Sequence, residues 1–289
     1  MTQIGARALV AWPLLVAEIL ILGTAAFALL LAPDTQSEEV ANALTPLWRG
    51  LGVAAVLFSP LALIVGTANM GDLSLRAAIP LLPQVIRETH FGHVWSWSFP
   101  LTLALLVIPW TPGRGRSKTI VLGLVACALL LLVSFSSHAI DRGTIAVIVY
   151  FIHEVAAALW IGAILGLWFG AVRGHLGSAW VLQTAPRVSS VAGWTVTILI
   201  LSGLYTAYYS LGADPHRLID AAYGRTLVDK ICAAMLVLLI GSYNRYWVMP
   251  AVSESSAQAS LLRNVGIESI LLIGVLGLAA LLANTPPVH

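Results

Sequence analysis

The chain has 289 residues, of which 59% are hydrophobic and only 10% are charged, and its mean hydropathy is +0.91. Because average soluble domains carry about 25% charged residues, this composition excludes a water-soluble globule. The 15 basic and 13 acidic residues give a net charge of +2 and form no basic patch, so we expect no nucleic-acid partner. Cys127 and Cys232 lie in separate apolar runs, which predicts packed core thiols and neither a disulfide framework nor a zinc motif.

Eight apolar stretches are long enough to cross the roughly 30 Å of a membrane's hydrocarbon core. Each is predicted to be a helix, because open strands cannot satisfy their backbone groups in lipid. The sequence therefore predicts an all-α, polytopic integral membrane bundle of about eight transmembrane helices, which forms a single transmembrane domain over residues 1–289. The predicted spans are 8–31, 48–70, 91–110, 119–138, 144–170, 188–211, 226–249 and 262–283.

The first predicted span follows Arg7, as the apolar core of a signal peptide would. Its apolar run is longer than the usual signal-peptide core and is interrupted by Glu18, so we expect a retained span. A carboxyl group in the middle of a span is costly in lipid. Glu18 is therefore a candidate for charge balance or proton coupling, and a polar contact between helices explains it equally well.

The third span opens with His90 and His93, which lie three residues apart and therefore on one helical face. This spacing suits a two-nitrogen site that captures a metal ion at the membrane surface. Imidazole is the commonest protein ligand for copper, zinc and iron. Two interfacial histidines without a ligand fit the same pattern equally well.

The fourth and fifth spans carry two more histidines, His138 and His153. His153 lies about nine residues into its helix, roughly 13 Å below the loop at a rise of 1.5 Å per residue. Ionisable groups at this depth favour a functional role, with a structural hydrogen bond as the alternative. The neighbouring Glu154 is a second candidate for charge balance or proton coupling. The depths of His138 and His153 differ by roughly 7–10 Å, so two successive metal stations fit better than one shared chelate.

An even number of spans places both termini on one side of the membrane. The loops after odd-numbered spans hold basic residues with few acids, which favours a cytoplasmic position for them and both termini outside. Six of the seven histidines then lie at the outer face. The first half carries Ala17-Glu18 where the second carries His153-Glu154, which is compatible with a four-plus-four repeat. Chance similarity between apolar helices explains this correspondence equally well.

The polar residues of the seventh span, Asp229, Lys230, Asn244 and Arg245, are interpreted as helix-end and interhelical contacts. The second half of the chain also carries a set of short motifs: Ser137-His138-Ala139, His153 with Trp160-Ile161-Gly162, Tyr223-Gly224-Arg225-Thr226-Leu227-Val228-Asp229-Lys230, Asn244-Arg245, Pro250, Arg263, Glu268 and Pro286-Pro287. On these motifs the chain resembles the CopD-type family of copper resistance and copper uptake membrane proteins, most clearly over residues 130–287. Ser137 and Ala163 stand where that family usually has glycine.

The resemblance implies a multi-pass protein of the bacterial inner membrane, with both termini on the periplasmic side, that moves copper inward. We expect the copper ion to be captured at His90 and His93 and to pass His138 and His153, while Glu154 and Glu18 balance its charge or accept protons. The oxidation state of the copper stays open. The resemblance also implies a periplasmic copper-binding carrier protein as a partner, beside the lipid bilayer.

Two other functions fit the same residues. One is a membrane electron-transfer protein that holds a b-type haem between paired histidines. The other is an assembly factor that delivers copper to an oxidase. We expect no enzyme, because the sequence contains no nucleophile elbow, phosphate-binding glycine loop or His-Glu-x-x-His motif.

Overall fold

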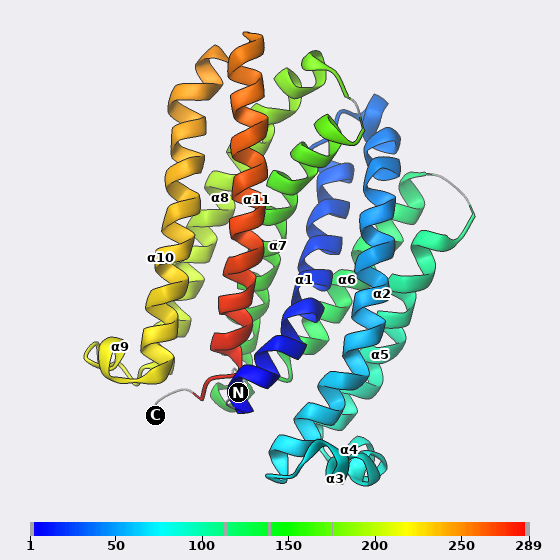
Figure 1. Cartoon of the computed structure of the whole chain (residues 1–289), viewed down its shortest axis with the longest axis vertical. Coiled ribbons are helices and arrows are strands. Elements are labelled where there is room, and N and C mark those ends of the chain that lie inside the picture. The colour runs from blue at the N-terminus through cyan, green and yellow to red at the C-terminus, as the bar shows by residue number, and fades with distance from the viewer. Residues whose placement is uncertain (1–2, 113–114, 138–139, 175, 287–289) are drawn as a thin grey trace.

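The computed structural model describes residues 3–112, 115–137, 140–174 and 176–286. Within these ranges the chain forms helices and connecting turns and no strands. Eight helical segments are long and apolar enough to cross a membrane, one for every predicted span. They stand side by side as a bundle (Figure 1), so the prediction of an all-α polytopic membrane protein is confirmed.

The eight long helices follow the order of the predicted spans. They are α1 (Gln3–Leu30), α2 (Ser37–Met70), α5 (His90–Val107), α6 (Arg116–Ser134), α7 (Thr144–Val172), α8 (Ser178–Ser210), α10 (Ala222–Tyr243) and α11 (Ser255–Ala283). The connecting elements are η1 (Asp34–Gln36), α3 (Leu75–Ala78), η2 (Ile79–Leu81), α4 (Leu82–Glu88), η3 (Ile108–Trp110), η4 (Ile140–Arg142), α9 (Arg217–Asp220), the π-helical η5 (Asn244–Val248) and η6 (Met249–Ala251).

Three helices, α2, α8 and α11, begin well before the apolar stretches that predicted them. Hydropathy reports only the part of a helix that fits the hydrocarbon layer, whereas the helical backbone continues into polar residues. In α2 the first turn carries Glu38 and Glu39, whose negative charges are favourable at the positive end of a helix dipole. These helices therefore extend beyond their apolar segments.

Two helices, α1 and α7, form the centre of the bundle. They pack against each other, and α1 also contacts α2, α6 and α11, whereas α8 packs mainly on α7 and α10 mainly on α11. In α1 and α7, 61% of the most apolar window is buried, against 6% in the span that contains α10. Cys232 on α10 is consequently exposed and Cys127 is partly buried, so the prediction of two core thiols is wrong for Cys232.

The central pair of helices crosses at Gly23 and Gly162. A Cβ atom added at Gly23 would overlap the backbone of Ala158 on α7, and a Cβ atom added at Gly162 would overlap the backbone of Gly23 on α1. Small residues are what allow two backbones to approach this closely in a membrane. The crossing therefore fixes the register of α1 on α7, and with it the relative positions of Glu18 and Glu154.

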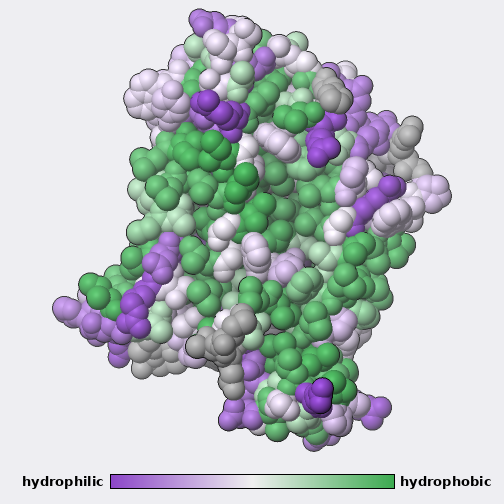
Figure 2. Space-filling model, in the orientation of Figure 1, coloured by the Kyte–Doolittle hydropathy of each residue, from purple (hydrophilic) through white to green (hydrophobic). Residues whose placement is uncertain are grey.

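The two ends of the bundle differ in what they carry. The start of α1, the end of α11 and the short helices α3, α4 and α9 lie at one end, which we call the terminal end; the opposite end is the distal end (Figure 1). On the surface, hydrophobic residues cover the middle of the bundle while hydrophilic residues gather at both ends (Figure 2). This distribution matches a protein whose middle lies in lipid.

Candidate functional site

Polar side chains from four helices meet inside the half of the bundle nearer the terminal end. Helix α7 begins at Thr144, so His153 and Glu154 lie more than two turns into it, as the sequence predicts. We call the group the α7 cluster. It consists of Glu18 of α1, Tyr150, His153 and Glu154 of α7, Ser202 of α8 and Lys230 of α10.

The two carboxyl groups of the α7 cluster are buried, with Glu18 5% and Glu154 9% exposed. Tyr150 hydrogen bonds to Glu154, and the half-buried Lys230 attracts the same carboxylate. Glu18 is close enough to Glu154 for the two to repel. Since one ammonium group faces two carboxyl groups, the cluster is neutral only when it holds one further positive charge. A proton or a metal cation would supply that charge.

The tautomer of His153 follows from its hydrogen bonds. Its Nδ1 lies 2.8 Å from Oγ of Ser202, and this hydroxyl lies 2.6 Å from the carbonyl oxygen of Ile198. A carbonyl only accepts, so the single hydroxyl proton points to Ile198 and Ser202 accepts from Nδ1–H of His153. The lone pair of His153 is therefore on Nε2. Metal-binding histidines are held in the same manner, by a hydrogen bond from the ring nitrogen that does not bind the metal.

His90 and His93 have the opposite tautomer. Nε2 of His90 donates to the carbonyl of Phe135 at 2.9 Å, and Nε2 of His93 donates to the carbonyl of Arg87 at 2.8 Å. Both rings are exposed, and each keeps its Nδ1 lone pair available. Phe135 stands three residues before His138, which lies outside the described residues. Over the described ranges, no three His, Cys, Asp or Glu side chains are arranged to hold a metal ion.

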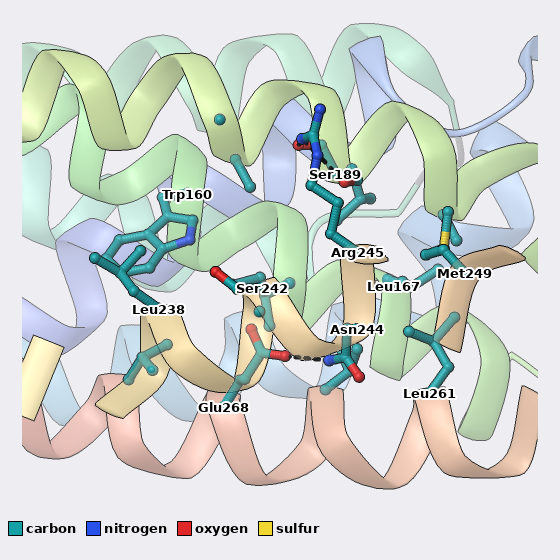
Figure 3. Close-up of a pocket in the computed structure, with 18 of the residues that line it drawn as sticks. Trp160, Leu167, Ser189, Leu238, Ser242, Asn244, Arg245, Met249, Leu261 and Glu268 are labelled. Atoms are coloured by element: carbon teal, nitrogen blue, oxygen red, sulfur yellow. Dashed lines mark hydrogen bonds between the residues drawn. The ribbon is translucent and has the colours of Figure 1, made fainter. Parts of the chain in front are cut away.

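A second polar site lies in the distal half, in a cavity of about 360 Å³ between α7, α8, α10 with η5, and α11. Glu268 and Asn244 meet across it (Figure 3). Asn264 donates to Asn244 at 2.8 Å, and Asn244 donates to Glu268 at 2.5 Å. Arg245 donates to the backbone and hydroxyl of Ser189. The interpretation of Asn244 and Arg245 as interhelical contacts is confirmed.

Sequence reasoning did not identify Glu268 as a site residue, although a usable signal was present. Glu268 is an ionisable residue in the middle of an apolar span, as Glu18 and Glu154 are. Such residues are rare inside membranes and tend to be functional. Lys230 is one of the residues interpreted as helix-end and interhelical contacts, and the structure shows that its charge acts on Glu154 of another helix.

Comparison with known proteins gives a family. The model of the copper resistance protein D-like N-terminal domain matches residues 1–145, and that of copper resistance protein D matches residues 182–282. The inner membrane protein YebZ of Escherichia coli (strain K12) is 24% identical over 247 residues, 84% of each chain. The copper transport protein CutJ of Bacillus subtilis (strain 168) is 24% identical over 223 residues, 71% of this chain and 39% of that protein.

No solved structure matches the chain. The two family models do not cover the stretch that holds His153 and Glu154. The family match is therefore independent of these two residues of the α7 cluster. Together the two models nevertheless cover most of the sequence, and their order along the chain agrees with the continuous bundle described above. The chain therefore belongs to the copper resistance protein D family.

Proposed function

We propose that this protein carries copper inward across the bacterial inner membrane and that the α7 cluster is the station at which the ion crosses the interior. The observation that carries the proposal is His153, an imidazole inside the bundle whose Nε2 lone pair is available beside two buried carboxyl groups. The name of the relative CutJ describes copper transport, and that of YebZ describes an inner membrane protein. Both support the proposal.

The charge balance of the α7 cluster suggests how the ion is exchanged. The positive charge of Lys230 offsets that of the Glu154 carboxylate, so Glu18 supplies the uncompensated negative charge. When copper(I) binds Nε2 of His153, its single positive charge replaces a proton on Glu18, and the net charge of the cluster is unchanged. One imidazole nitrogen with sparse neighbouring ligands binds copper weakly enough to release it, which passage through a membrane requires.

The proposed inward direction is the one that the family resemblance implies, and the two ends of the bundle indicate where the copper ion would enter. Basic residues at the distal end favour a cytoplasmic position for it, which places the terminal end in the periplasm. Copper then arrives from the periplasm, or from a periplasmic copper-binding carrier, where the Nδ1 atoms of His90 and His93 are exposed. His138 is a further station on this route. We propose that the ion next reaches His153.

The test is copper uptake by purified protein in liposomes. We expect His153→Ala to abolish uptake and His138→Ala to reduce it, because each removes an imidazole from the route. His216→Ala is the control, since His216 is exposed in the loop at the same end and lies outside the spans. Uptake that is unchanged in a correctly folded His153→Ala protein would contradict the proposal.

The same preparations separate the other two functions. A haem protein would show strong visible absorption bands, whereas a copper(I) carrier is nearly colourless. A protein that only delivers copper to an oxidase would bind copper through His153 and yet fail to move it into liposomes. Either result would replace the transport proposal.

A further inference from the structure

We infer that Glu268 is a proton-binding site in the distal cavity, filled from the distal side and coupled to the movement of copper. The coupling rests on the proposed transport function, whereas the proton site itself does not. The inference starts from the position of the carboxyl group, which is 4% exposed and lines the cavity.

The hydrogen bonds around Glu268 all point toward one of its oxygens. Asn264 donates to Asn244, and Asn244 donates to Oε1 of Glu268. The two amides are therefore oriented to stabilise negative charge on the carboxyl group. Oε2 receives no such bond and faces Gly241, where a Cβ atom would lie 3.5 Å away. The missing side chain of Gly241 leaves this oxygen open to the cavity.

The cavity can bring protons to Oε2. One water molecule needs roughly 10–15 Å³ of cavity volume. The cavity of about 360 Å³ therefore accommodates several water molecules. Ser189, Ser242 and Arg245 supply polar atoms along the wall. The π-helical turn η5 directs neighbouring residues to two sides of the cavity, Asn244 toward Glu268 and Arg245 toward Ser189. Single π-turns of this kind occur frequently at functional sites.

The chemistry of the cavity favours a proton over copper. Copper prefers imidazole and sulfur ligands, and among the residues that line the cavity there is no histidine or cysteine and a single thioether, that of Met249. A carboxyl group with one oxygen held by an amide and the other facing the cavity can take up a proton with little rearrangement.

Few other titratable groups face Glu268. From α10 and η5 these are Tyr246 and Arg245, and Arg245 is held by Ser189. The walls formed by α7 and α8 contribute no charged residue, and α11 contributes Glu268 alone. Glu18 on α1, which also packs against α11, interacts with Glu154 in the α7 cluster. Protonation of Glu268 should therefore follow the pH on the distal side, with little influence from neighbouring charged groups.

The first experiment is an infrared titration of metal-free protein in lipid bilayers. Metal-free wild type should show the band of the protonated Glu18 and, in addition, a protonated carboxyl band of Glu268. We expect Glu268→Gln to lack this second band and Glu254→Gln, at an exposed carboxyl just before α11, to retain it. Asn244→Leu should change the frequency of this band, because the carboxyl group loses its donor. If Glu268→Gln fails to fold, Glu268→Asp should still show a band at a new frequency. An unchanged second band in Glu268→Gln overturns the inference.

The second experiment measures copper uptake while the internal pH of the liposomes is varied. We expect uptake by the wild type to depend on internal pH and uptake by Glu268→Gln to lose that dependence. Equal pH dependence in both proteins would overturn the coupling to copper movement, whereas the inference that Glu268 binds a proton would still hold. Absence of copper uptake by the wild type would instead contradict the proposed function, and the infrared band would still decide the site.

Discussion

The α7 cluster and the distal cavity solve the same problem in different ways. Both hold carboxyl groups inside an apolar bundle, where an unpartnered charge is costly. In the α7 cluster, an opposite charge from Lys230 and a hydroxyl from Tyr150 surround Glu154. In the distal cavity, the neutral amide of Asn244 and open space surround Glu268. The first arrangement suits exchange of one cation for another, and the second suits uptake of a proton from water.

The largest effect is expected where the α7 cluster depends on helix packing. Gly162→Ala would drive a Cβ atom into the backbone of Gly23, and overpacking of this kind costs about 1–3 kcal/mol or more. We expect a marked fall in the thermal unfolding temperature and loss of the α7 cluster's copper binding. Gly274→Ala is the matched control, since nothing lies near its Cβ position. Equal unfolding temperatures for the two variants would refute the close crossing.

The next prediction concerns pairing of charges. Lys230→Met removes the positive charge that acts on the Glu154 carboxylate. Removing one partner of a fully buried ion pair costs about 3–5 kcal/mol, and we expect a smaller loss here than for Gly162→Ala, because Lys230 is half-buried and forms no close ion pair with Glu154. Adding Glu154→Gln should restore much of the stability. In the distal cavity, Arg245→Met and Glu268→Gln should be additive, since Arg245 binds Ser189. Chemical unfolding of single and double variants measures both couplings. Additive effects at Lys230 and Glu154 would disprove the interaction between them.

A smaller effect is expected from the hydrogen bond that fixes the tautomer of His153. Ser202→Ala removes the acceptor for Nδ1–H, and loss of such a supporting partner typically lowers metal affinity by about 10–100-fold. Copper titration of the purified protein would measure the change. Ser189→Ala, which removes a hydroxyl from the distal cavity, should leave the copper affinity as it is. A Ser202→Ala protein with wild-type affinity would show that Nε2 of His153 is not the ligand.

The smallest effect is expected at the exposed histidines. His90→Ala and His93→Ala should raise the copper concentration needed for half-maximal uptake and leave the maximal rate unchanged, because capture precedes the crossing step. Initial rates over a range of copper concentrations would separate the two quantities. A lower maximal rate in either variant would assign that histidine to the crossing step, together with the α7 cluster.

The eight spans could be predicted from the sequence, because the length and hydropathy of a stretch are local properties. Glu18, His153 and Glu154 could be identified for a related reason, since an ionisable residue within an apolar run is conspicuous before any packing is known. The histidines at the start of α5 were also visible as a spaced pair. Whether any of these residues meet could not be predicted.

Tertiary structure decided which residues are partners. The close crossing at Gly23 and Gly162 sets which faces of α1 and α7 meet, and thereby places Glu18 beside Glu154. The position of α10 turns Lys230 toward that pair and leaves Cys232 exposed. Hydropathy records how much each residue favours lipid, but partners and tautomers depend on the direction in which each side chain points from a packed helix. That direction is set by the neighbouring helices, and only the folded bundle contains it.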